Sequence, residues 1–89
     1  MAKQIFLLYS CSEWDRNSSL IYAGTSERKL KKVIENEIRE KNMIYNDDEL
    51  SVSKQIAAFK SDWKKRDRRW INNQLQYGFY DYTDNDTMI

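Results

Sequence analysis

Basic and aromatic side chains gather in one short segment of this chain, residues 60–70. Six Lys and Arg residues and two Trp residues fall within its eleven positions. If the segment were one helix, five of the cations would share a stripe, because residues four apart lie on the same face. Like charges at that spacing repel each other, so an anionic partner explains the stripe better than helix stability does. The candidate partner-binding residues are Lys60, Lys64, Lys65, Arg68, Arg69 and Trp70.

A second interpretation of segment 60–70 needs no partner. Lys and Arg side chains often cover apolar surface with their stems while the charged ends stay in water, and both indoles could then lie in the core. More cations stand at the start of the preceding predicted helix, and they extend the basic surface if the two helices lie side by side. These cations are Arg28, Lys29, Lys31 and Lys32.

The rest of the sequence gives little indication of catalysis. The chain has no His, the most common general base and metal ligand, and neither of its two Gly residues lies in a phosphate-binding loop. Cys11 would need a neighbouring cation or a helix N-terminus to become reactive. The acidic turn 47–49 does not match a calcium loop, although it could flank segment 60–70. We therefore expect no enzyme activity, no metal and no cofactor.

Trp14 is a separate feature, an indole in a polar loop between two predicted strands. It could close one end of a small core, or it could be an exposed anchor for a partner, because Trp is enriched at interface hot spots. The first interpretation predicts that removing the indole unfolds the domain, and the second predicts weaker association only.

Composition limits the size and the class of the protein. The 89 residues are enough for one small domain, and 40% apolar with 13% aromatic residues indicates a globular chain. A net charge of +1 provides no long-range attraction to polyanions, so nucleic-acid binding would need a local patch. A single Cys favours a reducing compartment, hence a cytoplasmic location. No apolar run approaches the ~20 residues that span a bilayer, so we expect no membrane insertion.

Hydrophobic periodicity predicts the elements that position segment 60–70. An ββααβ order predicts an α+β fold: a two-layer sandwich with a three-stranded antiparallel sheet, helices on one face, and the last strand beside the first. Residues 1–89 form a single domain with a frayed tail from about residue 84. A bent but continuous helix through 67 is the alternative to a break. The expected elements are strands at 4–10 and 19–23, a helix over 26–41 ended by Asn42, a short link or edge strand at 43–45, a helix from 51 to about 66, a break near 66–68, a shorter helix ended by Gly78, and a strand at 79–83.

Five parts of the chain together resemble a known group of proteins. They are residues 5–10, Glu13-Trp14, Ser18-Ser19, residues 26–32 and residues 75–78. Their arrangement resembles small uncharacterised proteins carried by phages and prophages of bacteria. The resemblance implies a compact cytoplasmic accessory protein, such as an inhibitor of a host factor, and it assigns no functional residue.

Three functions remain open. The first is a non-enzymatic protein-interaction module that binds an acidic protein partner through region 60–70, and the nearly neutral total charge favours it. The second is nucleic-acid binding, with phosphates on the basic residues and an unpaired base stacked on Trp70, Tyr77, Tyr80 or Tyr82. The third is a structural homodimer joined through sheet edges or the tyrosine-rich last strand.

Overall fold

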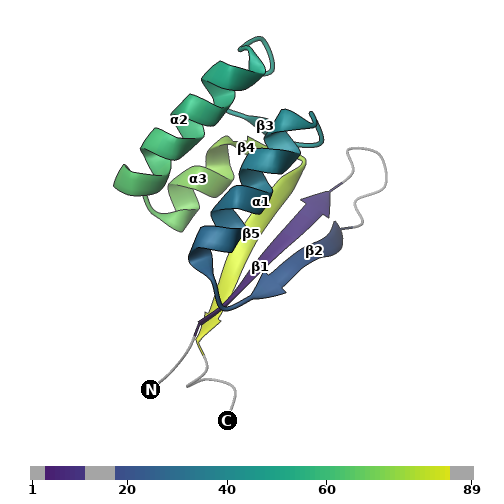
Figure 1. Ribbon diagram of the computed structural model, residues 1–89, viewed down its shortest axis with the longest axis vertical. Helices are drawn as coiled ribbons and strands as arrows, with labels where there is room; N and C mark the ends of the chain where they lie inside the picture. The colour runs from purple at the N-terminus through teal and green to yellow at the C-terminus, as the bar shows by residue number, and fades with distance from the viewer. Residues whose placement is uncertain (1–3, 12–17, 85–89) are drawn as a thin grey trace.

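Three antiparallel strands form the main sheet of the protein, in the order β2-β1-β5 (Figure 1). The structure is a computed structural model that describes residues 4–11 and 18–84. Strand β1 (Gln4–Cys11) is central, with β2 (Ser18–Gly24) on one side and β5 (Gly78–Asp84) on the other. The α+β class is confirmed, and so is the expected return of the last strand beside the first.

Helix α1 (Glu27–Arg39) forms because its apolar residues recur on one face and Ser26 caps its start. The Ser26 hydroxyl accepts a hydrogen bond from the Lys29 backbone N–H at 3.2 Å. The sequence predicts that Asn42 ends this helix, but α1 ends at Arg39, and the residue in the left-handed conformation that follows it is Lys41, with φ of 65°. The Asn42 N–H instead returns to a carbonyl of the last turn of α1, and such a bond closes a helix end.

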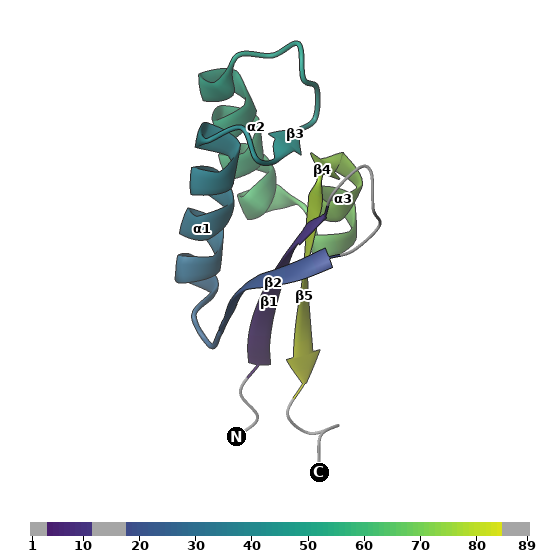
Figure 2. The ribbon, with the colours of Figure 1, turned by 90° about the vertical axis from the view of Figure 1, so that its right-hand side faces the viewer.

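Helix α2 (Val52–Lys65) begins after Ser51, whose hydroxyl accepts from the Lys54 N–H at 3.3 Å. It packs beside α1 in one helical layer (Figure 2); α1 lies on β1 and β2 of the main sheet, whereas α2 contacts β3 (Ile44–Tyr45) and α3 (Arg68–Gln74). The buried apolar side chains lie mainly between this helical layer and the sheet. They are Phe6, Leu8, Leu30, Ile34, Ile38, Met43, Tyr45, Phe59, Ile71, Leu75 and Tyr80.

The helical region breaks where the sequence predicts a break, so the continuous-helix alternative is wrong. Arg66 is extended, with φ of −117° and ψ of 161°. Asp67 then caps α3 (Arg68–Gln74) by accepting a hydrogen bond from the Trp70 N–H at 2.9 Å. A carboxylate at this position satisfies a backbone amide that a helix start leaves free.

A second, two-stranded sheet joins β3 (Ile44–Tyr45) to β4 (Leu75–Gln76). The predicted end of the last helix at Gly78 is therefore wrong: α3 ends at Gln74 and β4 follows directly. Tyr77 makes the left-handed turn, with φ of 69°, and Gly78 is already the first residue of β5. The link at 43–45 is thus a short strand, as one of its two predicted alternatives proposed.

Helix α3 lies beside β5 and closes that edge of the main sheet (Figure 1). The Asn72 side-chain amide donates to the Tyr80 carbonyl at 2.8 Å and accepts from the Tyr80 N–H at 2.9 Å. A side chain therefore takes the place that a fourth strand would occupy at this point. The Trp14 prediction and the tail beyond residue 84 lie outside the described residues.

Candidate functional site

The six candidate residues are divided between two helices. Lys60, Lys64 and Lys65 belong to α2, whereas Arg68, Arg69 and Trp70 belong to α3. The prediction of five cations on one continuous helical stripe is wrong, because the chain is extended between the helices. The candidate residues instead surround the junction between α2 and α3.

Two of these cations have acidic partners within the chain. Lys60 Nζ lies 3.7 Å from the Glu35 carboxylate on α1, and Arg68 Nη1 lies 3.0 Å from the Asp81 carboxylate on β5. The Arg68 guanidinium also lies 5.0 Å from the centre of the Tyr82 ring. These contacts connect α2 to α1 and α3 to the sheet, so Lys60 and Arg68 have structural partners of their own.

The other three cations, Lys64, Lys65 and Arg69, are exposed and have no ion pair with any described residue. Nearby Asp67 uses one carboxylate oxygen to cap α3. The carboxylates of Asp62 and Asp67 offset only two of the four charges of Lys64, Lys65, Arg66 and Arg69, so the junction keeps a net positive charge although the whole chain is nearly neutral.

Trp70 is exposed yet fixed in position. The residue is 39% exposed, and its indole Nε1–H donates to the Asp62 carboxylate at 3.2 Å. The Arg66 guanidinium lies 4.2 Å from the centre of the indole ring, within the range of a cation–π contact. The indole is held by one hydrogen bond and one stacked cation before any partner arrives.

Asp62 connects this indole to the core. The same carboxylate oxygen accepts a hydrogen bond from the Tyr45 hydroxyl at 2.6 Å, and Tyr45 itself is fully buried. Burial, and then the bond to Asp62, raise the pKa of Tyr45 well above its usual range, so the hydroxyl remains a donor at neutral pH. Tyr45, Asp62 and Trp70 thus form a continuous hydrogen-bonded path from the core to the surface.

The second indole of the segment, Trp63, belongs to the core rather than to the surface. It is half-buried, and its ring centre lies 5.3 Å from that of Phe59 and 5.3 Å from that of Tyr80. The i, i+4 spacing from Phe59 is the sequence signal for this placement. The solvated-face interpretation, with both indoles in the core, is therefore wrong for Trp70.

Sequence reasoning missed Arg66, the sixth cation, because it lies outside the expected stripe. It lines a shallow hollow of about 380 Å³ together with Lys65, Asp67 and Trp70. Helical spacing could not have predicted its contact with Trp70, because Arg66 is extended and lies outside both helices. We define the junction surface as Lys64, Lys65, Arg66, Arg69 and Trp70.

The sequence predicts that the cations at the start of α1 extend the basic surface if α1 and α2 lie side by side, and the two helices do so. Helix α1 packs beside α2, and Arg28, Lys29 and Lys32 are exposed. Glu27, the first residue of α1, lines a hollow together with Arg66. The start of α1 therefore adjoins the junction surface and can extend its basic area.

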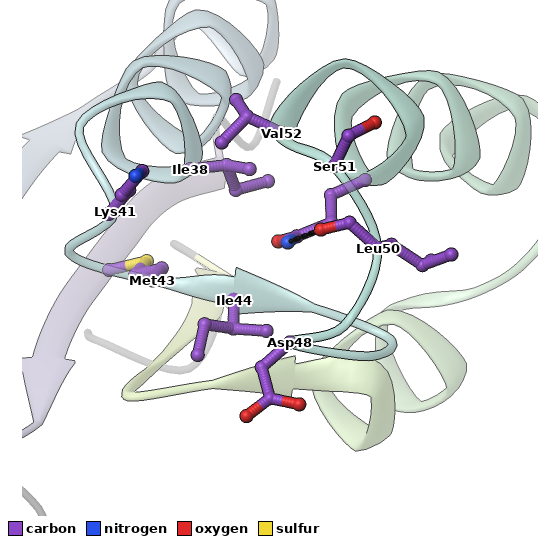
Figure 3. A pocket seen from close by; sticks show the side chains of 9 residues that line it. Ile38, Lys41, Met43, Ile44, Asp48, Leu50, Ser51 and Val52 are labelled. Carbon is purple, nitrogen blue, oxygen red and sulfur yellow. Dashed lines mark hydrogen bonds between the residues drawn. The ribbon is translucent and has the colours of Figure 1, made fainter.

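A second pocket, of about 280 Å³, lies at the opposite end of α2 (Figure 3). Gln55 is its buried polar residue, and its amide already pairs with the Tyr45 N–H at 3.0 Å and with the Leu50 carbonyl at 2.9 Å. Asp48 of the acidic turn 47–49 lies at this pocket, so the expectation that the turn flanks the basic segment is wrong. The two features are separated by the length of α2 (Figure 1).

Comparison with known protein families, curated proteins and solved structures finds no match for this chain. Among the described residues, no helix combines the length and the apolar composition that crossing a membrane requires.

Proposed function

We propose that this protein is a non-enzymatic interaction module that binds an acidic surface of another protein through the junction surface. The observation that carries the proposal is Trp70, which is 39% exposed but held by Asp62 and Arg66. Trp and Arg are enriched among the residues that dominate binding energy at protein interfaces. Because the indole is already ordered, binding loses less side-chain entropy than it would with a mobile anchor.

The chemistry of the partner follows from the cations around the indole. Lys64, Lys65 and Arg69 are exposed and have no acidic partner among the described residues, so carboxylates of a partner protein would complement them. The net charge of +1 supports a protein with a local acidic patch over a long polyanion. The resemblance to small phage proteins fits a module of this kind that inhibits a host factor.

Capture from lysate of the source cell tests the proposal. The immobilised full chain should retain a protein after nuclease treatment. The triple variant Lys64→Glu, Lys65→Glu, Arg69→Glu should retain at least about tenfold less of it, a loss of roughly 1.4 kcal/mol in binding free energy. The matched control reverses Arg39, Lys41 and Lys54, three exposed cations at the other end of the helical layer, and should capture as the wild type does.

Two outcomes would contradict the proposal. Equal capture by the junction variant and the wild type would show that another surface binds the partner. Material that is lost after nuclease treatment, with binding that weakens steeply as salt rises, would assign the junction surface to nucleic acid instead.

A further inference from the structure

The outer face of the main sheet, opposite α1 and α2, is apolar. The strand register places Tyr9 of β1 between Leu20 of β2 and Phe79 of β5, in one row across this face. The rings of Tyr9 and Phe79 are stacked, with centres 4.8 Å apart. Leu20 is 52% exposed and Phe79 is 37% exposed, so this row forms an apolar surface in contact with solvent.

Strand β1 carries apolar side chains on both of its faces. Phe6 and Leu8 are buried under the helices, whereas Leu7 and Tyr9 alternate with them on the outer face. An antiparallel strand with one face in water usually alternates apolar and polar residues, and two apolar faces are typical of a sheet covered on both sides. Yet α1 and α2 lie on one side and α3 lies beside β5, so no described element covers β1 and β2 on the outer side (Figure 2).

The outer face has almost no charge with which to select a charged partner. Among its described residues, Asp81 is the one ionisable carboxylate, and its charge is paired with Arg68 at 3.0 Å. A second copy of the chain would therefore present the same apolar surface, and no unpaired charge on one copy would repel the same charge on the other. These properties are those of a self-complementary, two-fold interface.

The edges of the sheet are less suited to a second copy than its face. The Asn72 side chain already hydrogen-bonds the backbone N–H and C=O of Tyr80 on the β5 edge. These groups are therefore not free to pair with a strand of a second copy, which disfavours the expected dimer through the edge of the last strand. On the other side, the β1–β2 register shifts between Leu8 and Tyr9, and such bulges discourage pairing along an edge strand.

The area of the face is close to what a dimer needs. Three strands of seven or eight residues give a surface of roughly 25 by 14 Å before side-chain relief is counted. Two such faces amount to about 700 Å² in projection, and side-chain relief raises the buried area towards ~1,000 Å², the lower limit of specific protein interfaces and the size expected of a weak dimer. We propose that the outer sheet face binds the same face of a second copy, with the two sheets about 10 Å apart, in a homodimer that dissociates on dilution.

Sedimentation equilibrium of the purified full chain tests this dimer over concentrations from about 5 to about 500 µM. The wild-type mass should rise from the 10.8 kDa of one chain towards twice that value. Leu20→Glu should remain at the mass of one chain across the range, because it brings a charge into each half of the interface. Ser53→Glu adds the same charge at an exposed position on α2 and should dimerise as the wild type does.

A wild-type chain that stays monomeric throughout, or a Leu20→Glu variant that dimerises normally, would overturn the proposal. Far-UV circular dichroism establishes that the variants are folded. If Leu20→Glu does not fold, the wild type alone decides the matter, since the melting temperature of a dimer rises with protein concentration and that of a monomer does not. A melting temperature independent of concentration would count against the dimer.

Discussion

At the scale of single residues, the position of Trp70 depends on Asp62. One carboxylate oxygen accepts from both the Trp70 indole and the Tyr45 hydroxyl. Asp62→Ala should lower the free energy of unfolding by about 1–3 kcal/mol, because it leaves the Tyr45 hydroxyl without its acceptor. The same substitution should also weaken partner capture, because the indole is no longer held in place. Urea unfolding measures the first effect and capture from lysate the second.

Tyr45→Phe is the matched control for Asp62→Ala. It removes the hydroxyl of the buried ring but leaves the bond from Trp70 to Asp62 intact. We expect it to lower stability without lowering capture. If Asp62→Ala captures the partner as well as Tyr45→Phe does, Asp62 has a structural role only and does not position the indole for binding.

At the scale of elements, Gly78, the first residue of β5, lies where the fold leaves no room for a side chain. A Cβ atom at this position would lie 2.7 Å from the Met43 sulfur and 2.9 Å from the Tyr9 carbonyl oxygen. Gly78→Ala should therefore destabilise the protein by about 1–3 kcal/mol, since a backbone atom cannot move aside as a side chain can. Gly24→Ala is the control: its Cβ would meet the end of the Tyr22 side chain, which can shift, so its loss in urea unfolding should be smaller. Equal losses at the two positions would contradict this explanation.

The elements with several turns or alternations could be predicted from the sequence, whereas the contacts between them could not. Leu30, Ile34 and Ile38 recur with the helical period, which is sufficient to identify α1. The two-residue strands β3 and β4 are too short to show any period, because they exist only through pairing with each other across the fold. Because Leu75 already pairs in β4, α3 ends at Gln74 rather than at Gly78, where the sequence predicts its end.

The candidate site was predictable in composition but not in geometry. Segment 60–70 contains all five residues of the junction surface, and its charge density alone identifies it. The separation of Lys64 from Arg69 depends on the extended conformation of Arg66, and the exposure of Trp70 depends on where α3 packs. Both are tertiary properties that local spacing does not determine.

At the scale of the whole molecule, the two proposed surfaces lie on different sides of the fold. The junction surface is at the α2–α3 side, beyond β5, whereas the outer sheet face is centred on β1 (Figure 1). Charges are screened over about 8 Å at physiological salt, a short distance in a molecule that measures 44 by 32 by 19 Å. A dimer through the sheet would therefore keep both junction surfaces open and present two of them to a partner.

This separation predicts that the two interactions are independent. In sedimentation equilibrium at physiological salt, Lys64→Glu, Lys65→Glu, Arg69→Glu should dimerise as the wild type does. In capture from lysate, Leu20→Glu should retain the same partner. Any loss of captured material should be no larger than the avidity that a dimer gains from binding through two linked junction surfaces. Mutations at sites that share no contacts have additive effects. A chain that carries both sets of substitutions should therefore lose dimerisation as Leu20→Glu does and lose capture as the triple variant does. A junction variant that also fails to dimerise would instead place the junction surface inside the homodimer, and the acidic partner would then be a second copy of this chain.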